Sequence, residues 1–173
     1  MGPTHLIAVA ILSVWLAATL FVWFAATRTF STVERILRKA NPQFVETSKP
    51  LGEDQTRVLL RYLASEINRA YFWWYGVAQI LLAALLLLLL WRQTPRDAIA
   101  LAVVWTMLGL VLVLTLVVTP LVVSLGQRLD FVPRTPPPPL LSRFWALHGA
   151  FTGLDGVKLL AGLGLLVRWI LAR

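Results

Sequence analysis

Asp155 and Lys158 are the two residues of this 173-residue chain whose type and position most need an explanation. They stand three residues apart inside an otherwise apolar stretch, 144–167. Each charged side chain deep in a membrane span costs about 2.5–3.5 kcal/mol on insertion scales. Because residues three apart share one face of a helix, we expect the carboxylate and the ammonium to pair. Candidate partners for the pair elsewhere in the chain are Thr115, Thr19 and Gln79.

Three roles are open for this pair. It can be a structural ion pair inside the protein's own helices, a polar contact between subunits, or a proton relay, ion relay or substrate counter-charge. Polar residues inside membranes are often functional. A pair one helical turn apart neutralises itself, however, and no other apolar segment supplies a buried acid or base that would extend it into a relay.

His148 is the second candidate for chemistry. One role is a hydrogen bond to a backbone carbonyl or to lipid headgroups. The other is an axial ligand of haem or chlorophyll, because a single His on a span suits a tetrapyrrole and Gly149 beside it leaves room for a ring. No other cofactor is predicted. A chain with no Cys and two His has little with which to build a metal site, and no nucleophile–base set or phosphate loop is recognisable, so we do not expect an enzyme.

A second stripe of the same segment consists of glycines. On a helical wheel these glycines, Gly149, Gly153, Gly156 and Gly164, adjoin a polar stripe that consists of His148, Thr152, Asp155, Lys158 and Gly162. The spacing Gly149-x-x-x-Gly153 is a small-residue motif that lets another helix approach closely. We expect both stripes to pack against protein, either the chain's own helices or those of a neighbour.

Four apolar segments have to position these residues. Hydrophobic residues make up 58% of the chain and charged residues 14%, against about 25% charged in an ordinary soluble domain. This composition excludes a water-soluble globule and a disordered chain. About 20 apolar residues cross a bilayer, and the spans that qualify are about 6–27, 71–91, 98–125 and 144–167. The sequence predicts an all-α integral membrane protein, a single four-helix transmembrane domain over 1–173 built as an antiparallel bundle.

The distribution of Lys and Arg predicts the orientation. The connections 28–70 and 126–143 hold eleven of these residues, and the opposite side holds four; the counts include Arg134 and Arg173. By the positive-inside rule both connections are cytoplasmic loops of a multi-pass inner (plasma) membrane protein, and both termini lie outside. The net charge of +8 then faces anionic lipid headgroups on the cytoplasmic side, so we do not expect nucleic acid as a partner.

The first loop contains the start of a long helix. A helical pattern begins at Glu53 and nothing breaks it before Trp91, so the second span has a cytoplasmic helical extension. Its polar residues Arg57, Arg61 and Arg69 form a candidate docking surface for a partner protein. The alternative is that the extension rests on lipid headgroups or on its own loop.

Aromatic residues and prolines mark the ends of the spans. Trp and Tyr favour the membrane interface, so Trp23, the run 71–75 and Trp145 are expected in an inner aromatic belt. Pro120 is expected to kink the third span or to begin its exit. The run Pro136–Pro139 predicts a stiff polyproline spacer in the third connection.

The segment Arg143-Phe144-x-x-Leu147-His148-Gly149 resembles a known family. It is similar to small bacterial four-helix membrane proteins of unknown function that are related to eukaryotic transmembrane protein 205. The order of four spans with a long first loop is similar as well. The resemblance implies the fold and marks His148 as a noteworthy position. The Asp155/Lys158 pair and the Pro136–Pro139 run are not part of the family pattern.

These observations indicate surfaces for interaction with other subunits rather than a catalytic site. We expect a non-catalytic structural or accessory subunit of a larger membrane complex, of respiratory or photosynthetic type, with other membrane subunits or further copies of itself as partners. One alternative is a small oligomeric transporter or channel that uses Asp155 and Lys158. The other is a haem- or chlorophyll-binding subunit that uses His148.

Overall fold

The computed structural model describes residues 2–133 and 135–171, so Arg134 and Arg173, which entered the charge count, lie outside the described residues. Within these ranges every regular element is helical. Four helical stretches are long and apolar enough to cross a membrane: Pro3–Arg38, Pro42–Trp91, Ala98–Leu129 and Leu140–Leu171. The predicted all-helical class and the number of candidate spans are confirmed.

Each predicted span corresponds to a longer helix. The elements in chain order are α1 (Pro3–Arg38), α2 (Pro42–Ser48), the 3₁₀ turn η1 (Lys49–Leu51), α3 (Gly52–Trp91), α4 (Ala98–Val113), the π-helical turn η2 (Leu114–Val118), α5 (Thr119–Leu129) and α6 (Leu140–Leu171). The extra turns carry polar residues, which a search for apolar runs leaves out. The continuous helix predicted from Glu53 to Trp91 corresponds to α3, which is 40 residues long.

The break between α1 and α3 follows from local chemistry. Asn41 precedes Pro42, and its side-chain oxygen accepts a hydrogen bond of 2.8 Å from the amide of Gln43, so it caps the start of α2. Gly52 then adopts a φ of +71°, in the left-handed region that favours glycine. The chain can therefore reverse direction within a few residues, at the start of α3.

Of the two outcomes predicted at Pro120, a kink or an exit from the span, the exit is wrong, because the helix continues past this residue. Proline lacks an amide hydrogen, and its ring clashes with the carbonyl four residues earlier in a regular α-helix. The π-helical turn η2 lies directly before it and widens the helix at this point. The chain consequently continues as α5 to Leu129.

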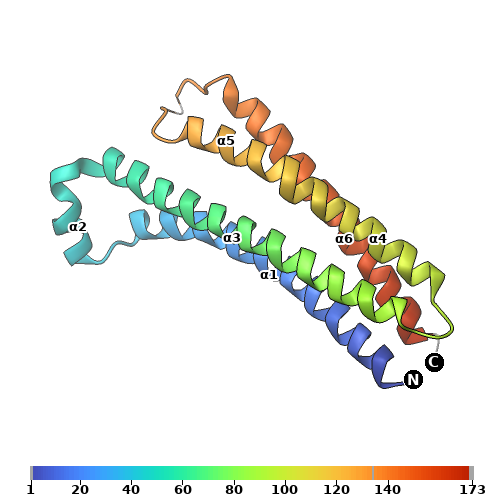
Figure 1. Ribbon diagram of the computed structural model, residues 1–173. Helices are drawn as coiled ribbons and strands as arrows, with labels where there is room; N and C mark the ends of the chain where they lie inside the picture. The colour runs from blue at the N-terminus through green and yellow to red at the C-terminus, as the bar shows by residue number, and fades with distance from the viewer. Residues whose placement is uncertain (1, 134, 172–173) are drawn as a thin grey trace.

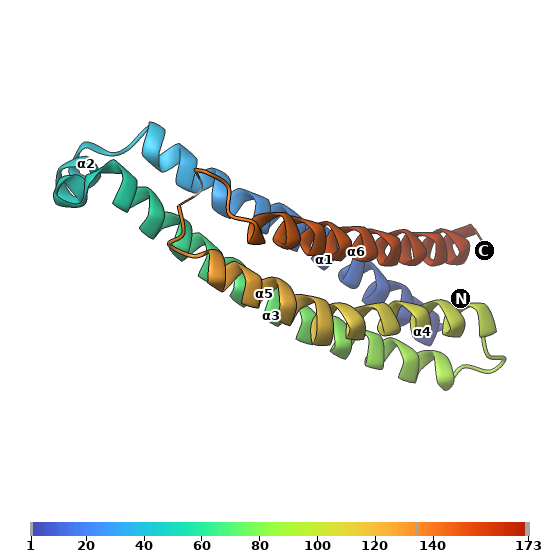
Figure 2. The same ribbon diagram turned by 90° about the horizontal axis from the view of Figure 1, so that it is seen from above.

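The four long helices form a ring in cross-section. α1 contacts α3 and α6, and α4 contacts the same two helices. Both termini and the α3–α4 connection lie at one end, whereas α2 and the α5–α6 connection lie at the other (Figures 1 and 2). The last turns of α1 and the first turns of α3 continue past the α5–α6 connection as a helical pair with α2 at its tip (Figure 1).

Asp97 ties the start of α4 to the end of α6 near the termini. It follows α3, caps α4 by accepting from the amide of Ala100 at 3.1 Å, and accepts from Arg168 of α6 at 2.7 Å. Trp169 adds a third hydrogen bond, of 3.2 Å. Partial burial acts to raise the pKa of Asp97, but these hydrogen bonds outweigh it and hold the pKa below its usual value.

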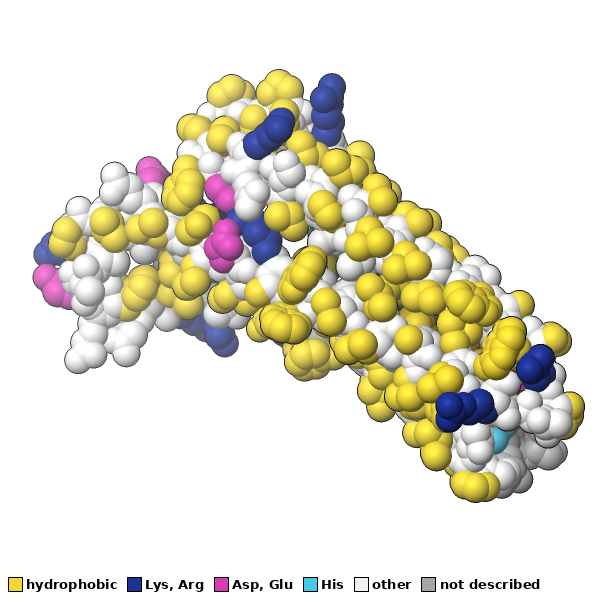
Figure 3. Space-filling view, viewed as in Figure 1, with side chains coloured by type: hydrophobic (Ala, Val, Ile, Leu, Met, Phe, Trp, Pro, Cys, Tyr) yellow, Lys and Arg dark blue, Asp and Glu magenta, His cyan; other side chains and the backbone are white. Residues whose placement is uncertain are grey.

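Apolar side chains fill the ring and also cover its outside. The core cluster takes residues from all four long helices, among them Leu12, Trp15, Leu86, Val104 and Leu159. On the face shown in Figure 3, hydrophobic side chains cover the four-helix part, and charged side chains gather toward its two ends and on the α1–α3 extension. A broad apolar exterior between charged ends is the surface expected of a multi-pass membrane protein.

One close approach joins α3 to the π-helical turn. A Cβ added to Gly76 would lie 2.6 Å from Thr115 Cγ2 and 2.8 Å from its Oγ1. Threonine is β-branched and stiff about χ1, so its side chain cannot easily turn away. The approach of α3 and η2 therefore depends on glycine at position 76.

Gly76→Ala should destabilise the protein by about 1–3 kcal/mol, the usual cost of overpacking a core. The matched control is Gly109→Ala on α4, where an added Cβ meets nothing within 4 Å. That control should be neutral or stabilising by about 0.5–1 kcal/mol, because alanine favours helices over glycine. Thermal or denaturant unfolding in one detergent compares the two; a Gly76→Ala variant as stable as the wild type would contradict the packing argument.

Candidate functional site

Asp155 and Lys158 lie in the interior of the four-helix ring. Both side chains are 0% exposed, and Lys158 Nζ lies 2.5 Å from Asp155 Oδ1. They stand one turn apart on α6, so the helix itself brings them together. This is the only ion pair among the described residues whose two members are both completely buried.

The Lys158 ammonium has an acceptor for each of its three donor positions. Besides Asp155 Oδ1 it donates to the hydroxyl of Tyr75 at 2.9 Å and to the side-chain oxygen of Gln79. The ammonium also lies 5.0 Å from the centre of the Tyr75 ring and 6.0 Å from that of Trp15. An ammonium offers three donors and no acceptor, so its hydrogen-bonding capacity is fully used.

The Asp155 carboxylate has further partners on α1 and α3. Its Oδ2 accepts from the indole nitrogen of Trp23 at 2.8 Å and lies 3.0 Å from the Tyr75 hydroxyl. That hydroxyl also lies 2.8 Å from Thr19 Oγ1. A phenol has one proton, so Tyr75 donates either to Asp155 or to Thr19 at any moment, while it accepts from Lys158.

Three helices each supply one row of this polar network. α1 contributes Trp15, Thr19 and Trp23, spaced four residues apart. α3 contributes Tyr75 and Gln79 with the same spacing, and Trp15 donates to the Gln79 oxygen at 3.1 Å. Residues four apart share one face of a helix, so each row points in a single direction.

Gly162 continues the inward face of α6 beyond the charged pair. A Cβ added there would lie 2.6 Å from Leu16 Cδ2 and 3.0 Å from Met107 Cε. The missing side chain lets α1 and α4 approach α6 next to the network. The predicted polar stripe is therefore interior at Asp155, Lys158 and Gly162, whereas Thr152 is exposed and His148 is half-buried.

Two aromatic residues do not lie where the sequence predicted. Trp23 and Tyr75 were expected in an interfacial belt, but Tyr75 is 4% exposed and both bind Asp155. Both side chains are directed toward the interior of the ring, where they bind Asp155. Thr115, a candidate partner of the pair, instead packs against Gly76. The usable signal in the sequence was spacing, since Tyr75 and Gln79 lie one turn apart.

The glycine stripe faces away from the chain's own helices. A Cβ added to Gly149, Gly153 or Gly164 would meet nothing within 4 Å, and all three residues are exposed. Gly156 differs, because its added Cβ would lie 3.8 Å from the Trp23 ring. The small-residue motif is thus free to contact another molecule.

His148 sits among aromatic rings of its own helix. Its ring stacks on Phe144 with 5.8 Å between centres and meets Trp145 edge-on at 5.7 Å. In the described part of the chain, no group of three or more His, Asp or Glu could hold a metal ion. A tetrapyrrole on His148 stays a prediction.

The three arginines predicted as a docking surface have partners inside the chain. Arg57 and Arg61 each pair with Glu34 of α1, at 3.0 and 3.1 Å. Arg69 pairs with Asp130 at 2.6 Å and also with Glu66. These contacts hold the extension of α3 along α1 and place it against α5.

The comparisons with known proteins add no relative. No protein-family model, curated protein or solved structure matches the chain. The resemblance of the segment Arg143–Gly149 to the bacterial four-helix family stays a prediction.

Breaking the buried pair should destabilise the protein strongly. Asp155→Asn leaves a buried ammonium without its counter-charge, and Lys158→Met leaves a buried carboxylate, so each should cost about 3–5 kcal/mol. The double variant buries no charge and should be more stable than either single variant. Denaturant unfolding of the four proteins in one detergent measures the coupling.

The exposed pair of Arg61 and Glu34 provides the control. Glu34→Gln and Arg61→Met should each cost no more than about 1 kcal/mol, because water screens half-exposed charges. If the two Asp155 and Lys158 effects simply add in the double variant, the pair does not act as a unit.

Proposed function

We propose that this chain is an integral membrane protein whose four long helices cross the inner membrane as an antiparallel bundle. We propose further that it acts as a non-catalytic structural or accessory subunit of a larger membrane assembly. The observation that carries the proposal is the contrast on α6. Asp155 and Lys158, in the middle of the helix, are completely buried, whereas Gly149, Gly153 and Gly164 are bare on the outside.

The sealed network supports a structural role for the charged residues. A transported solute or proton needs a route to the groups that bind it. Asp155 and Lys158 have no exposed surface in the structure. Asp155, Tyr75 and Gln79 accept from the three donor positions of the Lys158 ammonium. The geometry therefore favours the accessory role over a transporter or channel that uses this pair.

The bare glycines support an interaction role. Without a hydrophobic driving force between helices in lipid, association depends on close backbone approach and van der Waals packing. Gly149 and Gly153 are one turn apart on the exposed side of α6, next to Ala146 and Val157. A helix of a partner subunit or of a second copy can pack directly on this surface.

Replacing the exposed glycines should weaken association without unfolding the protein. Gly149→Ile/Gly153→Ile adds bulk where the chain has open space, so the fold has room for it. Blue-native electrophoresis in mild detergent should show the wild type in an assembly and the variant shifted toward the 19.4 kDa protomer. Gly109→Ile, at an exposed glycine of α4, is the control that should leave the assembly intact. A wild-type protein that runs as a lone monomer would refute the proposal.

The proposed orientation puts the α1–α3 extension in the cytoplasm and both termini outside, by the positive-inside rule. The chain contains no Cys, so single cysteines can be introduced without background. In intact spheroplasts, an impermeant maleimide should label Thr94→Cys, in the α3–α4 connection, but should label Thr47→Cys, on α2, only after lysis. The reverse labelling pattern would show that the topology is opposite to the proposed one.

A further inference from the structure

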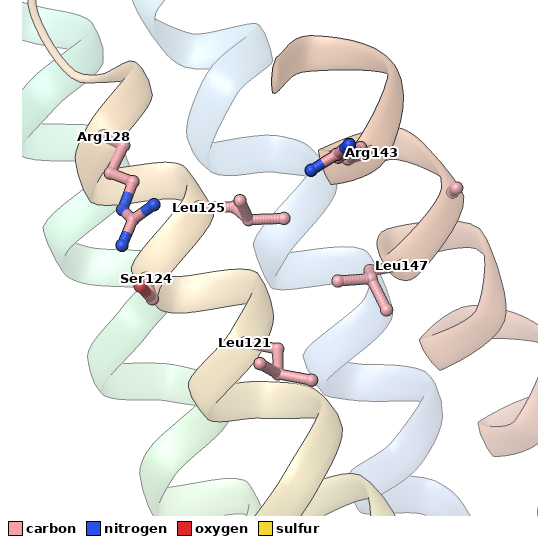
Figure 4. Close-up of a pocket in the computed structure, with 7 residues that line it drawn as sticks. Leu121, Ser124, Leu125, Arg128, Arg143 and Leu147 are labelled. Carbon is pink, nitrogen blue, oxygen red and sulfur yellow. The ribbon is translucent and has the colours of Figure 1, made fainter.

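We propose that a groove between α5 and α6 binds an anionic phospholipid of the inner leaflet. The groove has a volume of about 470 Å³ and is lined by residues of α5 between 121 and 128 and of α6 between 143 and 147 (Figure 4). The proposal rests on the membrane insertion and orientation proposed above. It adds a defined lipid site to a protein for which a general attraction to anionic headgroups is already expected.

The groove has one arginine from each of its two helices, and apart from Ser124 the rest of its lining is apolar. Arg128 is one residue from the end of α5, and Arg143 is in the first turn of α6, so both lie at the end of the bundle away from the termini. Leu121 lies about 10 Å deeper than Arg128 along the helix, at 1.5 Å per residue. Figure 4 shows Leu125 and Leu147 pointing into the space between the two helices, below Arg143.

The two arginines lack a counter-ion in the described part of the chain. No ion pair is formed there by Arg128 or Arg143, although Arg57, Arg61 and Arg69 are all paired. Asp130, directly after α5, is the carboxylate nearest to Arg128 in the sequence, and Arg69 already binds it at 2.6 Å. The mouth of the groove therefore carries two positive charges that an external anion can neutralise.

An anionic phospholipid matches this arrangement at both ends. A guanidinium binds two phosphate oxygens at once through parallel N–H groups. Basic pockets between membrane helices on the cytoplasmic side are suited to anionic headgroups. The headgroup phosphate would lie between Arg128 and Arg143, and the first part of an acyl chain would lie along Leu121, Leu125 and Leu147. A zwitterionic lipid brings its own positive charge into the same mouth and is disfavoured.

A lipid titration of the delipidated full chain in detergent tests the site. Phosphatidylglycerol and phosphatidylcholine with identical acyl chains are added, and bound lipid is counted by native mass spectrometry. We expect phosphatidylglycerol to bind more tightly. Arg128→Gln and Arg143→Gln should each weaken it about fivefold, and the double variant about thirtyfold, with phosphatidylcholine unaffected.

Two further variants distinguish binding in the groove from a general electrostatic attraction between the protein and anionic lipid. Arg35→Gln/Lys39→Gln removes two positive charges from exposed positions at the end of α1 and should leave lipid binding unchanged. Ala146→Trp keeps both groove arginines but fills the apolar wall, and should reduce phosphatidylglycerol binding.

Four results would overturn the proposal: equal affinity for the two lipids, an equal loss in the Arg35/Lys39 control, full binding by Ala146→Trp, or binding of soluble glycerophosphoglycerol as tight as that of the lipid. The last result would assign the arginines to a free phosphate. The titration needs neither a partner nor a bilayer, so its failure is distinguishable from failure of the association and topology tests.

Discussion

The structure depends on one electrostatic constraint: two full charges sit where water does not reach. Removing an ion from water costs several kcal/mol even after the surroundings relax, and attraction between opposite charges offsets this only when the remaining donors and acceptors are also satisfied. Lys158 and Asp155 meet that condition through Tyr75 and Gln79 of α3 and Trp23 of α1. The pair therefore joins three helices and fixes the rotational orientation of each helix about its own axis.

Much of the surrounding packing serves the same arrangement. Gly76 and Gly162 remove side chains on either side of the network, so that η2, α1 and α4 come close to α3 and α6. At the end near the termini, Asp97 links the start of α4 to Arg168 and Trp169 of α6. At the opposite end, Arg69 links α3 to Asp130 after α5. Polar contacts at three levels set the register of helices whose apolar surfaces alone would pack in several ways.

The outer surface differs from the interior in the side chains that it presents. Exposed aliphatic and aromatic side chains cover the bundle. Within this surface, the exposed glycines of α6 form a strip without side chains. The groove between α5 and α6 carries two arginines. Both features lie on α6, the helix that also carries the ion pair. A helix anchored inward by Asp155 and Lys158 can present a fixed face outward, which is what recognition of a partner helix or a lipid requires.

The sequence alone determined the all-helical class and the approximate place of each long helix. Runs of about 20 apolar residues are a one-dimensional property, and the helical pattern from Glu53 to Trp91 corresponds to α3 almost to the residue. The spacing of Asp155 and Lys158 likewise predicted that they would meet, because one helix holds both. The sequence did not identify all the partners of this pair. Whether Trp23 and Tyr75 point toward lipid headgroups or toward the ring axis depends on the rotation of α1 and α3, and hydropathy does not record rotation. The same limit applies to the glycine stripe, to Glu34 as the partner of Arg57 and Arg61, and to the groove at Arg128 and Arg143. Each of these involves residues on different helices, which only the tertiary structure brings side by side.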